Sequence, residues 1–271
     1  MPEGHVIHRL AHELDATFAG HVVRVSSPQG RFAEGARRMD GATLAGADAL
    51  GKHLLLAFAD RPEQVHVHLG IFGKVALARA TSIPAVGLIR LRLESATHTV
   101  DLRGPTTCEL LLPDQVDALF ARIGPDPLRP DADPDRAWRR IKASRTSLAV
   151  LLMDQAVLSG VGNIYRAEVL FRHRIAPTLP GNKLTRRKWI AMWDDLVYLM
   201  ALGVADGRID TVRPEHEPQA MGREARDDRH GGEVYVYRRA GMPCLVCGTS
   251  IATRELAARN LFWCPSCQRR R

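Results

Sequence analysis

Four cysteines near the carboxyl end have the spacing of a metal site. Cys244 and Cys247 form one Cys-x-x-Cys pair, and Cys264 and Cys267 form a second pair after an interval of sixteen residues. Two such pairs can direct four thiolates at one tetrahedral zinc ion, which would be structural because no position is left for water. Two disulfides or unrelated thiols are the alternative. Cys108 stands apart in an apolar strand, where a cysteine is usually a small buried hydrophobe, and we assign it no role.

The amino terminus is the second candidate for chemistry. Pro2 is a small residue after Met1, and an initiator methionine in that position is normally removed, which would expose the secondary amine of Pro2. An α-amino group has a pKa of about 7.7–8.0, so part of it is uncharged and nucleophilic near neutral pH. Such an amine can form an iminium ion with a sugar aldehyde carbon, and the neighbouring Glu3 could transfer protons. The alternative is that Pro2 merely follows the start codon; a retained Met1 would block the nucleophile.

The charge of the chain favours a polyanionic partner. The net charge is +8 and the isoelectric point is about 9.6. Residues 238–271 contain seven arginines and one acid, Glu255, so most of the excess charge lies in the segment that carries the cysteine pairs. A zinc ion bound by four thiolates would carry a charge of about −2 and weaken that field. Nucleic acid is the commonest partner of such a protein, and an anionic membrane surface is the alternative.

Signals for membrane insertion or export are missing from the sequence. No apolar run is long enough to cross a bilayer. The first residues, MPEGH, lack the basic and apolar pattern of a signal peptide. We therefore expect a cytoplasmic protein with no membrane partner.

Local patterns predict a β-rich first part and a helical second part. A helix is expected over residues 5–18, where Val6, Leu10 and Leu14 recur near helical spacing. Strand-like pieces, β-branched or alternating and separated by Gly, Pro and Asp, follow at 21–25, 53–58, 64–69, 74–78, 88–93 and 97–102. This pattern is typical of a β-sandwich or barrel.

The helical part follows a stretch rich in proline and aspartate, 124–135, which is typical of a linker. Helical patterns cover residues 137–142, 148–154, 164–171 and 185–205. The polar segment 214–232 has no periodicity and is expected to be a long mobile loop. Short strands are expected around the cysteine pairs.

Four separated motifs resemble those of one enzyme family. The chain starts with MPEG, and Lys52 lies between two predicted strands in LGKHLLLAF. The sequence LLMDQAVLSGVGNIYRAEVLF spans 151–171, and PCLVCGTSIATRELAARNLFWCPSCQ spans 243–268. In this order and over the whole chain, these motifs resemble the formamidopyrimidine-DNA glycosylase and endonuclease VIII family.

The resemblance implies an α+β multidomain fold with damaged DNA as its partner. The expected order is an N-terminal β-sandwich catalytic domain over 1–113, a linker over 114–135, a helix–two-turns–helix DNA-binding domain over 136–232 and a zinc-ribbon finger over 233–271. One structural zinc ion would brace the finger. We expect a monomer that works in base excision repair and is associated with the nucleoid.

The resemblance also implies roles for individual residues. Pro2 would attack C1′ of the damaged nucleotide, expel the base and form a Schiff base, while Glu3 would protonate the sugar oxygen and help to move protons. Lys52 would contact the phosphate or assist release of the base. Successive β- and δ-elimination would then cut the strand on both sides of the lesion. Asn163 and Arg259 would hold the phosphate at the lesion.

Local physical chemistry supports the two phosphate contacts. Gly160, Gly162 and Asn163 predict a tight turn before a helix, and backbone amides at a helix start bind phosphate well. Arg259 lies five residues before Cys264 on a predicted hairpin, where a bound zinc ion could hold the guanidinium group rigidly against a phosphate. A solvated surface arginine is the alternative.

An enzyme that extracts a base from a duplex must fill the space left behind. The segment 68–73 matches the wedge loop of the family, so Ile71 and Phe72 are candidates, although both could instead be core residues of a strand. Arg103, in DLRGPTTCEL, could partly replace an arginine–phenylalanine pair of the void-filling loop that this sequence lacks. Glu168 could orient the amino-terminal amine or be a surface carboxylate of its helix.

Departures from the oxidised-purine pattern favour the endonuclease VIII branch. The purine branch begins MPELPE, whereas Gly4 and Val6 stand here in MPEGHV. Arg166 replaces the alanine of that branch and becomes a candidate DNA-binding residue. The segment 214–232 does not resemble the usual loop that caps 8-oxoguanine. We therefore expect removal of oxidised pyrimidines; the alternatives are an 8-oxoguanine or formamidopyrimidine glycosylase, a monofunctional glycosylase, a catalytically inactive protein that binds damaged DNA, and a zinc-ribbon adaptor or RNA-binding protein.

Overall fold

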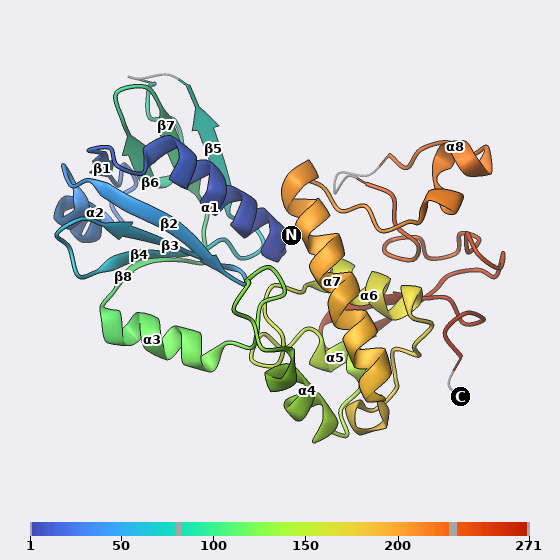
Figure 1. Cartoon of the computed structure of the whole chain (residues 1–271). Helices are drawn as coiled ribbons and strands as arrows, with labels where there is room; N and C mark the ends of the chain where they lie inside the picture. Colours follow the sequence, from blue (N-terminus) through green and yellow to red (C-terminus); the bar gives the residue numbers. More distant parts are fainter. Residues whose placement is uncertain (1, 80–82, 228–231, 270–271) are drawn as a thin grey trace. The chain divides into compact units, whose positions relative to one another are not determined.

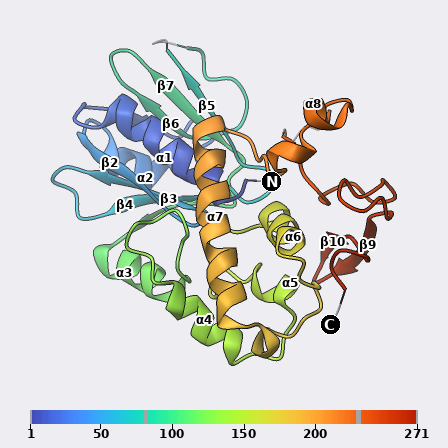
Figure 2. The same cartoon turned by 45° about the vertical axis from the view of Figure 1, so that its right-hand side comes forward.

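The computed structural model describes residues 2–79, 83–227 and 232–269. The chain forms two compact units, residues 1–122 and residues 123–271, which we call unit 1 and unit 2 and describe separately (Figures 1 and 2). In the described parts of the chain, every helix is too short or too polar to span a bilayer.

Unit 1 is a β-sandwich of two four-stranded antiparallel sheets. The first sheet has the order β1 (Arg24–Ser26), β6 (Ile89–Glu94), β7 (Thr99–Arg103) and β5 (Lys74–Ala78). The second has the order β2 (Leu44–Leu50), β3 (His53–Phe58), β4 (Gln64–His68) and β8 (Thr107–Leu111). Hairpin connections account for the neighbouring pairs β2–β3, β3–β4 and β6–β7.

The core of unit 1 lies between the sheets and the first helix, α1 (Gly4–Phe18), which packs along β2 (Figure 1). The helix buries one face, including Ile7, Leu14 and Phe18, as the spacing of its apolar residues predicts. In β3, Leu54 and Leu56 enter this core. Because side chains alternate along a strand, His53 and Leu55 lie on the opposite face of the sheet.

The helix α2 (Ala33–Met39) and the strand β8 lie outside the predicted elements of unit 1, and β2 was predicted only as an unbounded strand before Lys52. The sequence of β2, LAGADAL, is rich in alanine and glycine, which are weak strand formers, and it takes strand conformation by pairing with β3. The expected linker over 114–135 begins within a further helix, α3 (Pro113–Arg122). The proline starts this helix, which buries Val116 and Leu119.

Unit 2 contains the predicted helices and a short hairpin. Its elements are α4 (Pro134–Lys142), α5 (Leu148–Leu151), α6 (Asn163–Arg172), η1 (Gly181–Lys183), α7 (Arg186–Asp206), η2 (Pro214–His216), α8 (Pro218–Met221), β9 (Ala252–Leu256) and β10 (Arg259–Trp263). Thr185 caps α7 by accepting from the backbone of Lys188 at 3.4 Å, and Gly207 ends it with a φ of 71°.

Helix α6 lies at the centre of unit 2, and all of its residues except the last, Arg172, are buried. It packs against α7, α5 and β10. A helix buried on every side must satisfy its polar side chains internally. Arg166 and Glu168, which the sequence alone would place at the surface, are buried in this helix, so their charged groups must find partners inside unit 2.

Candidate functional site

Two buried ionisable residues, Glu3 and His5, lie close to the start of the chain in unit 1. Pro2 is partly exposed, whereas Glu3 has only 1% of its surface exposed and stands at the N-cap of α1, where its backbone oxygen accepts from Val6 at 3.0 Å. A carboxylate is stabilised at a helix N-terminus by the helix dipole. Burial, with a contribution from the positive charge of the amino terminus, lowers the pKa of His5 to about 4. An amine at residue 2 would therefore adjoin a buried carboxylate and an uncharged imidazole.

Lys52 occupies the two-residue turn between β2 and β3. Leu50 and His53 are the last register pair, and Gly51, the first turn residue, has a φ of 58°. A positive φ at that position fits the tight hairpin turns that glycine favours. The turn holds the partly exposed Lys52 at the end of the sheet, as the sequence predicts.

Ile71 and Phe72 lie in the loop between β4 and β5. Phe72 has 81% of its surface exposed and Ile71 has 49%, so neither belongs to the core. Gly70, with a φ of 65°, and Gly73, whose amide donates to the backbone oxygen of Leu69 at 3.0 Å, make the loop tight. A tight loop that presents two large apolar side chains to solvent has the form expected of a wedge.

Arg103 is held by neighbours in unit 1. Its guanidinium group donates to the Asp101 carboxylate at 2.8 Å and to the backbone oxygen of Val86 at 3.2 Å. The same carboxylate accepts two hydrogen bonds from Arg92, at 2.6 and 2.9 Å. Arg103 is thus the partly exposed member of a buried ion-pair network.

Asn163 begins α6 in unit 2 and is linked to the hairpin. Its side-chain nitrogen donates to the backbone oxygen of Asn260 at 3.0 Å. Arg166, one turn further along, has 1% of its surface exposed. Its guanidinium group donates to the Asn163 side chain, to the same Asn260 oxygen at 3.4 Å and to the Ala149 oxygen at 3.1 Å. Arg166 therefore supports the Asn163 side chain from the buried interior and links α6 to the hairpin.

Arg259 follows the tip of that hairpin. Leu256 and Arg259 are a register pair, and the two turn residues between them, Ala257 and Ala258, have φ values of 51° and 57°. Arg259 is partly exposed, and its guanidinium group makes a long contact of 3.4 Å with the Ala258 oxygen. The side chain is thus accessible to solvent.

The four cysteines of unit 2 form one compact cluster. All four sulfur atoms lie within 4.8 Å of one another, with 3.9 Å between Cys244 and Cys267 and 3.5 Å between Cys247 and Cys264. Zinc–sulfur bonds of about 2.3 Å in a tetrahedron place the sulfurs roughly 3.8 Å apart. None of the four is in a disulfide, so the prediction of a four-thiolate site is confirmed. The cofactor is one structural zinc ion.

Glu168 is a buried residue of α6 whose partners the sequence does not reveal. It is fully buried, and its carboxylate accepts from the backbone amides of Tyr235, Val236 and Tyr237 at 2.7, 2.9 and 2.8 Å. The Thr211 hydroxyl donates to it at 2.7 Å. These hydrogen bonds hold the backbone of residues 235–237, which leads into the first cysteine pair, against α6. The alternative of a surface carboxylate is wrong, because no part of the residue reaches solvent.

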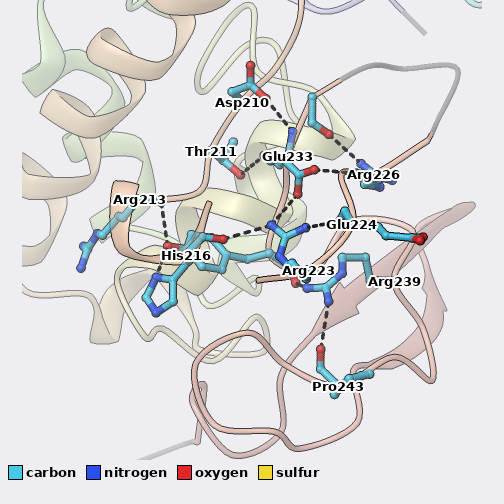
Figure 3. A network of polar contacts seen from close by, with 12 residues as sticks. Asp210, Thr211, Arg213, His216, Arg223, Glu224, Arg226, Glu233, Arg239 and Pro243 are labelled. Carbon is cyan, nitrogen blue, oxygen red and sulfur yellow. Dashed lines mark hydrogen bonds and ion pairs between the residues drawn. The ribbon is translucent and has the colours of Figure 1, made fainter. Parts of the chain in front are cut away.

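A second carboxylate, Glu233, organises the polar segment that the sequence predicts to be mobile (Figure 3). It accepts from the Arg223 side chain and the Arg226 backbone, both at 2.6 Å, while its own amide donates to Asp210 at 2.6 Å. Arg223 also donates to the His216 oxygen at 3.0 Å. Burial opposes ionisation, but the hydrogen bonds from Arg223 and Arg226 lower the pKa of Glu233 below its usual value. The described part of this segment is thus tied to unit 2.

Comparisons with known proteins agree over the whole chain. Residues 1–108 match the formamidopyrimidine-DNA glycosylase N-terminal domain, 123–213 the formamidopyrimidine-DNA glycosylase H2TH domain, and 241–270 the zinc finger found in FPG and IleRS. Endonuclease 8 1 of Mycobacterium tuberculosis is 49% identical over 275 residues, covering 99% of this chain and 100% of the relative. The formamidopyrimidine-DNA glycosylase of Corynebacterium aurimucosum is 33% identical over 238 residues, covering 85% and 80%.

Solved structures show the same fold. The formamidopyrimidine-DNA glycosylase of Lactococcus lactis, bound to DNA that contains an AP site, has a TM-score of 0.80 at 23% identity and covers 99% of this chain and 100% of that one. The predicted order of β-sandwich, helix–two-turns–helix segment and zinc finger is therefore confirmed.

Proposed function

The chain belongs to the formamidopyrimidine-DNA glycosylase and endonuclease VIII family, and we propose that it removes oxidised pyrimidines from DNA and cuts the strand through a Schiff base at Pro2. Membership makes the protein a DNA glycosylase with abasic-site lyase activity, which acts in DNA repair. The nucleophile, the other site residues and the lesion are the proposal. The burial of Glu3 beside the amino terminus is the observation that carries it.

In the proposed reaction, the neutral nitrogen of Pro2 bonds to C1′ while the bond from C1′ to the base breaks. The base leaves with the bonding electrons and takes up the proton that the Pro2 nitrogen loses, and Glu3 protonates the sugar oxygen so that the ring opens to an iminium ion. Loss of a proton from C2′ then expels the 3′ phosphate, and a second elimination expels the 5′ phosphate. Water hydrolyses the remaining iminium ion and releases the amine.

Phosphate binding is divided among three side chains in this proposal. Asn163 and Arg259 bind the lesion phosphate from unit 2, and Lys52 acts from the β2–β3 turn of unit 1. The buried contacts of Arg166 make it a positioning residue for Asn163 and the hairpin, not a direct ligand of DNA. Ile71 and Phe72 fill the space of the flipped base, and the exposure of Phe72 makes it the principal wedge.

Two observations support pyrimidine lesions. The relative named Endonuclease 8 1 matches the full length at 49% identity, well above the 33% of the relative named as a formamidopyrimidine-DNA glycosylase. The described part of segment 214–232 is bound to Glu233 by Arg223 and Arg226. The sequence of this segment also does not resemble the usual loop that caps 8-oxoguanine.

Borohydride trapping tests the proposal. The purified chain, with loss of Met1 verified by mass spectrometry, is incubated with duplexes that carry an abasic site, thymine glycol, 5-hydroxyuracil or 8-oxoguanine. We expect a covalent adduct that maps to residue 2 and forms faster on the two pyrimidine lesions than on 8-oxoguanine. Pro2→Gly keeps an amine without the ring and should trap more slowly.

Each failure of this experiment has a distinct meaning. An adduct that maps to a lysine would contradict the role of Pro2. Faster trapping on 8-oxoguanine would contradict the pyrimidine assignment while leaving the nucleophile in place. Absence of any adduct, with Met1 removed, would leave a monofunctional glycosylase.

A further inference from the structure

A chain of polar side chains crosses the face of the β2-β3-β4-β8 sheet that is opposite the core of unit 1, and takes no part in the reaction above. Nδ1 of His53 lies 2.8 Å from Nε2 of His66, and Nδ1 of His66 lies 3.0 Å from a carboxylate oxygen of Glu109. His66 is the register partner of Glu109 on one side and of Leu55 on the other. The three polar residues therefore come from three adjacent strands and share one face.

The acceptor at one end fixes the direction of this chain. A carboxylate only accepts, so Nδ1 of His66 must carry the proton that Glu109 receives. In the neutral form of His66, which has one donor and one acceptor, Nε2 is the acceptor and receives the Nδ1 proton of His53. Nε2 of His53 is then left without a proton. One half-exposed carboxylate thus sets the tautomers of two imidazoles.

His53 connects the chain to both DNA-facing elements of unit 1. It directly follows Lys52 in the hairpin and is the register partner of His68, which precedes the 69–73 loop. The rings of His53 and His68 are 5.0 Å apart, and the rings of His53 and His66 stack at 5.0 Å and 18°. A change in the orientation of His53 would therefore shift both the turn that contains Lys52 and the loop 69–73.

Burial and neighbouring charges lower the pKa values of His53 and His68 and so favour their uncharged forms. Burial is the main reason that the pKa of His53 falls to about 3, and the charges of His66, His68, Arg122 and Lys52 add to it. Burial also lowers the pKa of His68, assisted by His66 and Lys52. The groups that face His53 are therefore two imidazoles from β4, Arg122 from α3 and the adjacent Lys52. Because His53 and His68 stay neutral, they do not repel the ammonium group of Lys52.

We propose that Glu109 and His66 are positioning residues for the Lys52 turn and the wedge loop, which act by holding His53 in one orientation and one tautomer. The inference rests on the proposed function, since that function makes Lys52 and Phe72 the DNA-facing groups of unit 1. Neither Glu109 nor His66 touches substrate in this proposal. Their effect passes through His53 to the turn and through His68 to the loop.

The substitution Glu109→Gln tests the direction of the chain. Glutamine has nearly the size of glutamate but can donate as well as accept, so it no longer dictates which nitrogen of His66 is protonated. Glu34→Gln is the matched control, because Glu34 is an exposed glutamate of unit 1 in the first turn of α2. Both variants are measured as full chains with zinc bound.

Two readouts separate positioning from simple packing. Imidazole ¹⁵N spectra should show His53 and His66 of the parent chain in the Nδ1–H form, and Glu109→Gln should give mixed tautomers. Single-turnover release of thymine glycol should fall about fivefold in Glu109→Gln, the rate equivalent of roughly one hydrogen bond. Borohydride trapping on a preformed abasic site should stay within about twofold, since base release is already complete. Glu34→Gln should match the parent chain in all three.

A second pair of variants guards against a folding defect. His66→Gln offers an amide oxygen to Nδ1 of His53, whereas His66→Leu removes every polar contact. We expect His66→Gln to recover at least about half the parent rate of base release while His66→Leu stays about fivefold slow. Equal rates for both, or parental base release in Glu109→Gln, would overturn the inference, as would an Nε2–H tautomer of His53 in the parent chain. Failure of the parent chain to trap on abasic DNA would overturn the proposed function alone, because the tautomers are measured without DNA.

Discussion

The two units hold their candidate residues in opposite ways. In unit 2, Asn163 is held by a buried guanidinium group, the hairpin is braced by four cysteines, and the preceding loop is fixed by a fully buried carboxylate. In unit 1, Lys52 lies on a two-residue turn. Phe72, which has 81% of its surface exposed, lies on a loop. The candidate residues of unit 2 are therefore held by buried polar contacts and a metal site, whereas those of unit 1 extend from tight turns.

This contrast separates the effects of substitution. A change in unit 2 removes partners from buried polar groups, so it should reduce folding stability and DNA affinity together. A change in an exposed turn of unit 1 should reduce the reaction rate and leave stability nearly constant.

Loss of the zinc ion should produce the largest effect. Cys264→Ser removes one thiolate, and since binding of a structural zinc ion contributes directly to folding, we expect about 100-fold or more weaker binding of an abasic-site duplex. Fluorescence anisotropy measures the binding, and native mass spectrometry measures the metal. Cys108→Ser is the control, because burial raises the pKa of the Cys108 thiol to about 12 and keeps it neutral in unit 1. A zinc-free chain that binds as tightly as the parent would contradict the contrast between the units.

Arg166→Met should have the next largest effect, about 3 kcal/mol of unfolding free energy, because it removes a charged donor from two buried acceptors and from the partly buried Asn260 oxygen. Denaturant titration measures stability, and anisotropy measures the accompanying loss of DNA affinity. Arg259→Met is the matched comparison at a partly exposed site: affinity should fall while stability changes by less than about 0.5 kcal/mol. A loss of stability in Arg259→Met equal to that in Arg166→Met would remove the distinction between positioning and contact.

Acid should destabilise unit 1 before unit 2. An unfolded histidine binds a proton near pH 6.5, whereas the pKa of folded His5 is about 4, so the stability of unit 1 falls as pH drops through that window. The loss from His5 alone at pH 5 is about 2 kcal/mol, and His53, with a folded pKa of about 3, adds to it in the same unit. In unit 2, burial opposes ionisation of Asp195, but hydrogen bonds from His173 and Arg172 lower its pKa to about 2, so its contribution is lost only below about pH 4.

Hydrogen exchange at pH 7 and pH 5, corrected for the intrinsic rate, measures each unit separately. His5→Leu should reduce the acid sensitivity of unit 1. Equal loss of protection in both units would contradict the assignment of the acid-sensitive group to unit 1.

Phe72→Ala should have the smallest free-energy effect, roughly tenfold in the rate of base release, because stacking of a base on an aromatic side chain contributes about 1–3 kcal/mol. Single-turnover kinetics on a thymine glycol duplex measures the rate. Val22→Ala, at a site with 63% exposure in the same unit, should leave the rate unchanged. A melting temperature lowered by several degrees in Phe72→Ala would show that the side chain supports the fold and not the substrate.

The parts of the fold that were predictable have a strong local pattern. The helix α1, the long helix α7 and the strands β3, β4 and β5 follow from apolar spacing and from breaker residues at their ends. The strand β2 depends on its neighbours, because its alanines and glycine have little strand propensity of their own. The helix α3 was not predicted, because the linker expected from the proline-rich stretch 124–135 was extended back to residue 114 and so covered it.

The candidate site divides in the same way. The zinc cysteines are recognisable because the spacing of the ligands is a local property of the sequence. Pro2 is recognisable because removal of Met1 would make its nitrogen a free secondary amine. The burial of Arg166 and Glu168 was not predictable, since a charged residue in a helix is usually exposed and only tertiary partners show otherwise. His66 and Glu109 are 43 residues apart, and nothing in the sequence relates them until two strands pair.

The turn between β9 and β10 also suggests how to make the enzyme more stable. Ala257 and Ala258 adopt left-handed backbone conformations that an alanine takes at a penalty of roughly 1 kcal/mol each. An asparagine–glycine graft, which suits such a turn, would relieve that penalty without touching Arg259 or any cysteine. Laboratories that clean damaged template before amplification, and need an enzyme that tolerates storage and warm reaction mixtures, could begin with these two codons.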